Sequence, residues 1–308
     1  MEKLTSTAAV QALLQKSSGL DHEAGNPRVK SIVSRVLTDL FETIEDLDVQ
    51  PDELWAAAAY FTGLGQANEF GLLIAGLGIE AYLDLRLDET ERKAGLEGGT
   101  PRTIEGPLYV ADAPLSDGNA RLDDGGETGE VLFMGGQVRD DNGYPLAGAM
   151  VDVWHANTLG GYSFFDPSQK PYNLRRRIRT DAEGRYSFRS IMPSGYGCPP
   201  DGPTQALLTQ LGRHGRRPAH IHFFVTAPGC RKLTTQINID GDAYLHDDFA
   251  SATRDGLIPP IDRITDVAKI HERGLNTPFV QIEFDFVLHR EAAGIPGTDV
   301  HRTHATAA

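Results

Sequence analysis

Apolar residues in the first hundred positions recur at the spacing of α-helices. Between positions 29 and 44 they are three and one residues apart alternately, which places them on one helix face. These residues are Val29, Ile32, Val33, Val36, Leu37, Leu40, Phe41 and Ile44. Asn26 before Pro27 predicts the helix start, because asparagine is a preferred cap and proline is tolerated in the first turn. Two further helices are predicted, one after Pro51 and one from Leu72 to about Leu87. We interpret the apolar faces as packing surfaces of a core, although the face that begins at Val29 is equally compatible with a partner helix.

From Pro101 onward the pattern changes to short runs that alternate with period two, as β-strands do. Examples are Val151 and Val153, Tyr186 and Phe188, and the series Ile282, Phe284, Phe286 and Leu288. Turn signals such as Asp141-Asn142-Gly143 separate the runs. The sequence therefore predicts a helical domain over residues 1–100 and a mainly β sandwich or barrel over residues 101–308. The tail from Ala292 lacks periodicity and is expected to be extended or frayed.

Composition narrows the classes of function. The 29 Lys and Arg against 43 Asp and Glu give a net charge of −14, which repels nucleic acid and anionic membranes. Two cysteines, Cys198 and Cys230, are too few for a disulfide framework and form no CxxC motif. The start lacks a secretory signal, and the most apolar run, residues 71–79, is far too short for a membrane span. We expect a soluble cytoplasmic protein.

Two histidines, His220 and His222, are the first candidates for chemistry. Residues i and i+2 of a strand point to the same face, so the two imidazoles lie side by side as a natural pair of metal ligands. The alternative is a pair of histidines on a solvated or hydrogen-bonded strand face.

Two glycine-rich segments each contain a tyrosine. Ser194-Gly195-Tyr196-Gly197-Cys198-Pro199-Pro200 is one, and its glycines let the backbone come close to a site. Trp154-His155-Ala156-Asn157, followed by Gly160-Gly161-Tyr162, is the other. Considered alone, these are tight loops with partly buried aromatics, and Trp154 is expected in the core. The basic run Arg175, Arg176, Arg177 and Arg179 is interpreted as a solvated face.

Taken together and in this order, the segments resemble the intradiol ring-cleaving dioxygenases, most closely the catechol 1,2-dioxygenase group. The resemblance is carried by WHANTLGGY, SGYGCPP, RRPAHIHFF and TTQINI, and extends upstream to TPRTIEGPL and GLLIAGLG. It covers most of the chain. It implies intradiol cleavage of catechol by dioxygen to cis,cis-muconate, in the β-ketoadipate pathway of aromatic compound degradation.

The resemblance implies one non-haem Fe(III) per subunit, bound by Tyr162, Tyr196, His220 and His222 and by a hydroxide. Tyr196 and His222 would be axial, and Tyr162 and His220 equatorial. The ligand types suit the ion, because Fe(III) is a hard acid that favours anionic oxygen donors. Two phenolates and one hydroxide also balance its +3 charge.

Catalytic and substrate-binding roles are carried over in the same way. Tyr196 leaves the metal and takes a proton from catechol, Arg217 stabilises negative charge on the reacting ring, and Gln236 lies beside the metal. The expected ring pocket consists of Leu72, Ala75, Ile104, Pro107, Leu108, Cys198, Arg217, Phe249 and Ala250. The family often has proline where this chain has Ala75, so the shape of that wall is specific to this chain.

The helical domain of this family forms a homodimer interface with a lipid-containing tunnel, so a homodimer with bound lipid is expected. Three alternatives remain open. Chlorocatechol or hydroxyquinol enzymes share the metal ligands. A zinc or Fe(II) site could combine His220 and His222 with Asp240 or Asp242. A metal-free β-sandwich carrier would use its tyrosines for packing only.

Overall fold

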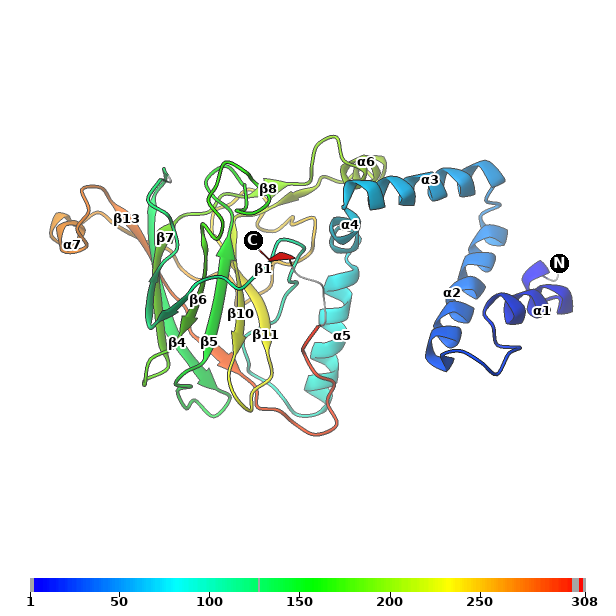
Figure 1. Ribbon diagram of the computed structural model, residues 1–308, viewed down its shortest axis with the longest axis horizontal. Coiled ribbons are helices and arrows are strands. Elements are labelled where there is room, and N and C mark those ends of the chain that lie inside the picture. Colours follow the sequence, from blue (N-terminus) through cyan, green and yellow to red (C-terminus); the bar gives the residue numbers. More distant parts are fainter. Residues whose placement is uncertain (1–2, 127, 301–304, 307–308) are drawn as a thin grey trace. The chain divides into compact units, whose positions relative to one another are not determined.

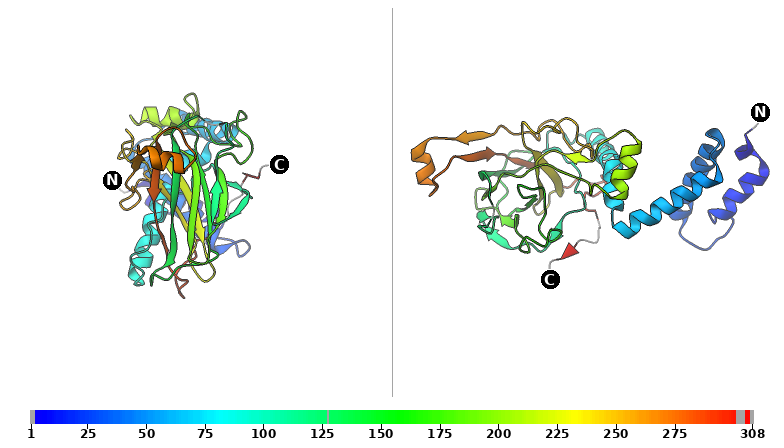
Figure 2. Two further views of the ribbon diagram at one scale, coloured as in Figure 1. Left: turned by 90° about the vertical axis from the view of Figure 1, so that its left-hand side faces the viewer. Right: turned by 90° about the horizontal axis from the view of Figure 1, so that it is seen from above.

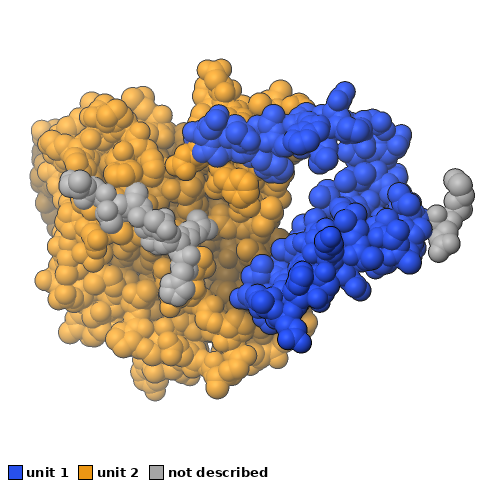
Figure 3. Space-filling model, turned by 45° about the vertical axis from the view of Figure 1, so that its right-hand side comes forward, with its two compact units in different colours: residues 1–67 blue, residues 68–308 orange. Residues whose placement is uncertain are grey.

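The computed structural model describes residues 3–126, 128–300, 305 and 306. The chain forms two compact units, Met1–Ala67 and Asn68–Ala308 (Figure 3). The division differs from the expected boundary near residue 100. Its reason is that two more helices belong to the second unit, although the change from helix to strand does fall between Lys93 and Val110.

The first unit is helical. It contains the 3-10 turn Leu4–Ser6 and the helices α1 (Ala8–Ser17), α2 (Pro27–Asp46) and α3 (Pro51–Ala67). The predicted start of α2 is confirmed, since the Asn26 side chain accepts hydrogen bonds from the backbone N–H groups of Arg28 and Val29. The start of α3 at Pro51 is confirmed as well.

The apolar face of α2 does not pack into a core of this chain. No residue of α2, all of which the structure describes, is buried. Val29 is 54% exposed, Ile32 46%, Val36 57% and Leu40 42%. The interpretation of this face as core packing is therefore wrong for the first unit, in which α1 packs against α2 but leaves these side chains exposed.

The third predicted helix is two helices, α4 (Phe70–Gly76) and α5 (Ile79–Lys93). They are separated by Leu77 and by Gly78, whose φ of 71° lies in the left-handed region that ends a helix. The sequence predicted a single helix because the spacing of its apolar residues continues across this break. Within the second unit α5 runs alongside β11 (Figure 1).

The second unit contains two main sheets. The five-stranded sheet has the order β11 (Leu233–Asn238), β10 (His220–Thr226), β5 (Met150–His155), β6 (Arg175–Arg179) and β2 (Leu115–Asp117). The six-stranded sheet consists of β12 (Asp262–Ile264), β13 (Phe279–Glu283), β4 (Val131–Asp140), β7 (Arg185–Ile191), β3 (Asn119–Arg121) and β14 (Phe286–Leu288), which also pairs with β4. The predicted alternation is confirmed, because Ile282, Phe286 and Leu288 are buried while Glu283 and Asp285 are exposed.

The two sheets pack face to face as a β-sandwich (Figure 1). The core between them draws buried residues from both, among them Leu132, Met134, Val151, Ile221 and Phe223. The segment of β12, α7 (Val267–Glu272) and β13 projects from the sandwich as an arm (Figure 2). The remaining elements are α6 (Pro203–Gln210) and two short pairs, β8 (Tyr196–Gly197) with β9 (Arg216–Arg217), and β1 (Val110–Ala111) with β15 (Ala305–Thr306).

Candidate metal centre

The two histidines lie on β10, between β5 and β11 in the five-stranded sheet. Both side chains point away from the core between the sheets, whose β10 residues are Ile221, Phe223 and Val225. Both are nevertheless only 1% exposed. Their Nε2 atoms approach to 3.0 Å. The alternative of a solvated strand face is therefore wrong, and the two ring nitrogens converge on one point.

The surroundings orient each imidazole. Nδ1 of His220 is 2.7 Å from the Pro218 carbonyl, so it is the donor nitrogen and leaves the lone pair on Nε2. The His222 ring stacks on Trp154 at 4.9 Å with an interplanar angle of 5°. Burial, aided by the nearby Arg217 cation, lowers the pKa of His220 to about 3 and that of His222 well below its ordinary value. Both rings are therefore neutral, as metal ligands must be.

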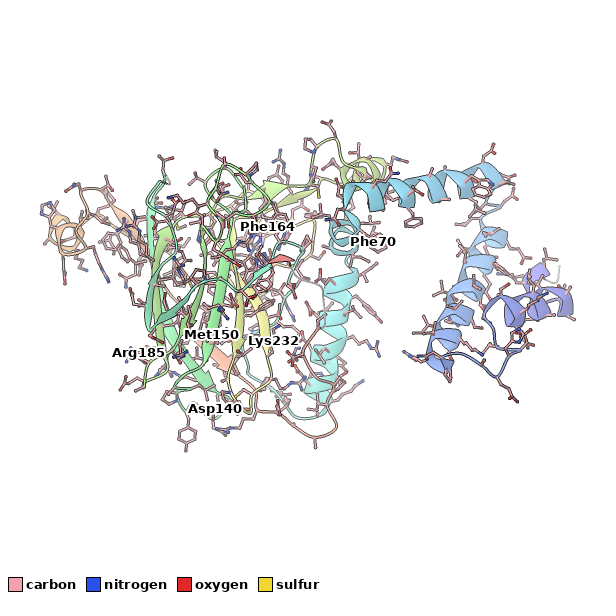
Figure 4. All side chains as sticks on the ribbon, in the orientation of Figure 1. Phe70, Asp140, Met150, Phe164, Arg185 and Lys232 are labelled. Atoms are coloured by element: carbon pink, nitrogen blue, oxygen red, sulfur yellow. The ribbon has the colours of Figure 1, made fainter. Side chains whose placement is uncertain are left out.

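Tyr162 reaches the site from the loop that follows β5. The Asn157 carboxamide oxygen accepts hydrogen bonds from the backbone N–H groups of Leu159 and Gly161 and so closes this loop. Phe164, two residues further on, lies at the opposite end of β5 from Met150 (Figure 4). The Tyr162 side chain is 3% exposed and its Oη lies 3.5 Å from His220 Nε2. Burial raises its pKa well above the ordinary value, so Tyr162 ionises only with a strong cation beside it.

Tyr196 is placed by the ribbon of β8 and β9, in which it pairs with Arg217. Its Oη is also 3.5 Å from His220 Nε2, and its ring meets that of Tyr162 edge to face at 5.4 Å. The neighbouring glycine allows this approach, since a Cβ at Gly195 would lie 2.5 Å from the Arg217 carbonyl oxygen. The expectation that these glycines bring backbone close to a site is confirmed.

These four side chains form a donor set that suits a ferric ion. Donors bound to one ion at about 2 Å each lie roughly 3 Å apart, which is the spacing seen here. His222 turns Nε2 toward the cluster, 3.0 Å from His220 Nε2, whereas its buried Nδ1 has no hydrogen-bond partner in the described part of the chain. Among the described residues, no group of three His, Cys, Asp or Glu side chains could hold a metal ion. The cluster described here contains only two residues of these types, because its other two donors are tyrosines.

The alternative site with a carboxylate ligand is not supported. The Asp242 carboxylate accepts hydrogen bonds from the backbone N–H groups of Ala219 and Tyr244, which it holds in a loop. Asp240 is exposed to solvent. Neither carboxylate belongs to the cluster around His220 and His222.

Arg217 lies at the edge of the donor cluster. Its Nη1 is 3.0 Å from His220 Nε2 and 3.5 Å from Tyr196 Oη. Its other nitrogens bind the Gln236 amide oxygen at 2.9 Å and both Asp248 carboxylate oxygens at 3.1 and 3.2 Å. Gln236 in turn donates to Asn238. Sequence reasoning found Arg217 and Gln236 but missed Asp248, whose only signal was its position before Phe249.

Most of the expected ring-pocket residues come together. Ala75, Ile104, Cys198, Phe249 and Ala250 form one buried apolar cluster with Leu208 and Ala252. Leu108 packs instead with Trp154, Tyr162, Phe224 and Tyr196. Leu72 is half-buried and Pro107 is exposed, so the structure places neither in these two clusters.

Two expectations about neighbouring residues have different outcomes. Trp154 is a core residue as predicted, at 1% exposure. The solvated-face interpretation of the arginine run is wrong for Arg175, which is 1% exposed, whereas Arg179 is exposed. Arg175 lies opposite Trp154 in the sheet and donates hydrogen bonds to Ser163 in the loop of Tyr162.

Comparisons with known proteins agree with this geometry. The profile described as "Dioxygenase" matches residues 104–290, and that described as "Catechol dioxygenase N terminus" matches residues 26–95. This chain belongs to the intradiol ring-cleaving dioxygenase family. Catechol 1,2-dioxygenase 2 of Acinetobacter lwoffii is 67% identical over 82% of this chain and 92% of its own length. The catechol 1,2-dioxygenase of Acinetobacter baylyi is 53% identical over 97% of both chains.

A solved structure of the family superposes over nearly the whole chain. The mercury-inhibited catechol 1,2-dioxygenase of Acinetobacter sp. ADP1 matches with a TM-score of 0.96 at 52% identity, over 99% of this chain and 100% of its own. This membership of an enzyme family argues against the metal-free carrier alternative. Within the described residues, no helix is both long and apolar enough to cross a membrane.

Proposed function

We propose that this protein is a catechol 1,2-dioxygenase that cleaves catechol with dioxygen to cis,cis-muconate. The proposed cofactor is one non-haem Fe(III) per subunit, bound by Tyr162, Tyr196, His220 and His222. The observation that carries the proposal is the convergence of two imidazoles and two phenols on one point. The His222 Nε2 atom and the two phenol oxygens lie 3.0–3.5 Å from His220 Nε2. Identities of 50–67% to curated catechol 1,2-dioxygenases support the choice of substrate.

A ferric ion held by these four side chains would supply Lewis acidity toward the catechol oxygens and would activate the ring toward dioxygen. Tyr196 is the residue suited to accept a catechol proton at Oη. It is the less buried of the two tyrosines, and its neighbour Arg217 supplies a hydrogen-bond donor 3.5 Å from Oη. Tyr162 is buried and is therefore suited to remain a permanent ligand.

Arg217 holds a fixed positive charge where negative charge develops on the ring. The hydrogen bonds that Arg217 donates to Asp248 and Gln236 hold its guanidinium in a fixed orientation toward Tyr196 and His220. Preorganised charge of this kind is worth about 3 kcal/mol of transition-state stabilisation in a water-poor site. Gln236 contributes by fixing one arm of that guanidinium.

The ring itself would lie against the apolar cluster of Ala75, Ile104, Cys198, Phe249 and Ala250. A flat apolar wall suits an unsubstituted ring whose polar edge is on the metal. Hydroxyquinol 1,2-dioxygenase of Rhizobium sp. and chlorocatechol 1,2-dioxygenase of Rhodococcus opacus are 34% and 35% identical to this chain. These lower identities favour catechol over the two alternative substrates.

The test combines absorption spectroscopy with turnover. Iron-loaded protein should be wine-red from phenolate-to-iron charge transfer, and anaerobic catechol should move the band to longer wavelength. Tyr196→Phe should keep iron and part of the band but lose about 100-fold or more in turnover, because a general base contributes about that factor. Near wild-type turnover with full iron content would disprove the base role. A colourless iron-loaded protein would disprove the ligand set.

The proposal includes a homodimer formed through the first unit. Its support is the exposed apolar face of α2, since a monomer rarely leaves such a face in water. A lipid acyl chain bound at that interface is part of the same proposal and would be detected by mass spectrometry of an organic extract. The proposed compartment is the cytoplasm, which suits the two free buried cysteines Cys198 and Cys230.

A further inference from the structure

One row of side chains crosses the five-stranded sheet directly beneath the donor cluster. Arg175 on β6 faces Trp154 on β5, Trp154 faces His222 on β10, and His222 faces Gln236 on β11. The exposure of all four is 0 or 1%. Gln236 and His222 belong to the site already described, so the row places Arg175 in contact with the same site from its other side.

Arg175 is a buried cation, and the buried carboxylate of Asp152 on β5 lies close enough to interact with its charge. Among the described residues, no ion pair links it to Asp or Glu. Its Nε donates to Ser163 Oγ at 2.9 Å and its Nη2 to the Ser163 carbonyl at 3.0 Å. Nη1 is buried and has no hydrogen-bond partner in the described part of the chain. A buried charge without a directly bound carboxylate is costly, so the fold retains the guanidinium against a penalty.

The group that Arg175 approaches is Tyr162. The guanidinium carbon lies 5.7 Å from the centre of the Tyr162 ring, within the range of cation–π attraction. Ser163 follows Tyr162 directly, and its hydroxyl also donates to the Asn173 carbonyl. The guanidinium thus binds both the side chain and the backbone carbonyl of Ser163, next to Tyr162, and its positive charge lies over the Tyr162 ring.

We propose that Arg175 is a positioning residue for Tyr162, fixing its loop through Ser163 and stabilising the negative charge of its phenolate. This inference rests on the proposed ferric site. It gives the buried guanidinium a nearby negative charge, because the phenolate lies beside a cation that forms no direct ion pair with a carboxylate among the described residues. It also distinguishes the two tyrosines, since Arg175 acts on the buried ligand Tyr162 and Arg217 on the exchangeable one, Tyr196.

The test measures the charge-transfer band of the iron-loaded protein. In Arg175→Met the band should move to longer wavelength at unchanged iron content. Without the nearby cation, the phenolate electrons are less stabilised, so less energy is needed to transfer one of them to the ferric ion. Arg175→Lys, which keeps the charge, should return the band toward its wild-type position. Arg179→Met is the matched control, since this arginine of the same strand is exposed and pairs with Asp117, and its band should not move.

Two outcomes overturn the inference alone. One is a coloured wild type with an unmoved band in Arg175→Met, and the other is an equal shift in Arg175→Lys and Arg175→Met. If Arg175→Met does not accumulate as folded iron protein, Arg175→Gln, whose amide can still donate to Ser163, is judged by the same criterion. A colourless wild-type iron protein would overturn the proposed ligand set and this inference together.

Discussion

At the scale of single residues, Asp248 determines how Arg217 faces the metal ligands. Both carboxylate oxygens bind the guanidinium, and they also accept hydrogen bonds from the backbone N–H groups of Ala250 and Ala252. The same side chain therefore links Arg217 to the loop of Ala250 and Ala252, which belong to the buried apolar cluster.

The Asp248–Arg217 pair predicts a dependence of stability on pH. Burial alone would raise the pKa of Asp248, but the charge and hydrogen bonds of Arg217 outweigh it and hold this pKa below its ordinary value. The carboxylate therefore stabilises the fold above its unfolded pKa of about 4, and this contribution is lost as the pH falls through the lower folded pKa. Asp248→Asn should cost about 3 kcal/mol at pH 7, since it leaves a buried arginine without its counter-charge.

Thermal unfolding of wild type and Asp248→Asn from pH 7 to pH 3 measures this effect. The difference in Tm should be largest at neutral pH and should begin to shrink as the pH falls below the unfolded pKa of about 4, because the carboxyl of the unfolded wild type then takes up a proton. A difference that stays constant across that range would contradict the assigned charge state.

Gly160 provides a second prediction at this scale. It has a φ of 83°, and a Cβ there would lie 2.8 Å from Tyr196 Cβ. Gly143 has the same φ of 83°, but a Cβ there would have no described neighbour within 4 Å. Gly143→Ala should therefore cost only the strain of about 1 kcal/mol for a left-handed residue. Gly160→Ala should in addition push Tyr196 away and reduce iron content and turnover. Equal iron content in the two variants would show that the close approach is unimportant.

How far the site could be predicted depended on the kind of signal each residue left. Tyr162, Tyr196, His220 and His222 stood in short motifs with a fixed order, and the structure brings them together. Arg175 looked like its neighbours in a basic run. Its burial depends on which strand lies beside β6 and on which loop covers it, and no local pattern contains that information.

At the scale of elements, α5 is attached to the sandwich by buried ion pairs. Glu91 is 5% exposed and binds Arg231 at 2.7 Å and also Arg102. Arg102 and Arg254 both bind Asp88, one turn earlier on the helix. These ion pairs form a network of alternating positive and negative charges that connects α5 to segments that follow it in the sequence.

Glu91→Gln should therefore destabilise the second unit by about 3 kcal/mol or more, because it leaves two buried arginines short of negative charge. Glu89→Gln is the matched control on the same helix. Glu89 pairs only with Arg92 and Lys93 on the surface, and such exposed pairs contribute between 0 and about 1 kcal/mol. Urea unfolding of the two variants decides the point, and equal midpoints would contradict a structural role for the buried pairs.

The same scale shows where periodicity misled the prediction of elements. The spacing of apolar residues continues through Leu77 and Gly78, so the sequence predicted one helix where the structure has α4 and α5. A positive φ at glycine is permitted but not required by the residue type. In the structure the turn allows α4 to pack against both α5 and α6.

At the scale of the whole molecule, the main disagreement between sequence and single chain is the apolar face of α2. Periodicity correctly placed Val29, Ile32, Val36 and Leu40 on one side of a helix. It could not distinguish a face that packs within the chain from one that packs against another copy, because both need the same residues. Since these side chains are 42–57% exposed, we infer that the face packs against a partner.

We predict that this partner is a second copy of the chain. A charge placed on the apolar face should therefore prevent the two copies from associating. Val36→Glu places a carboxylate in the middle of the apolar face, where burial against another apolar surface would cost several kcal/mol. Ser31→Glu places the same charge on the opposite, solvent-exposed side of the same helix. Sedimentation velocity over a range of concentrations should give dimers for wild type and Ser31→Glu and monomers for Val36→Glu. Because the metal ligands belong to Asn68–Ala308, iron content and the charge-transfer band should persist in the monomer. A dimeric Val36→Glu protein would move the interface away from α2, and loss of iron together with dimerisation would show that the site depends on the second copy.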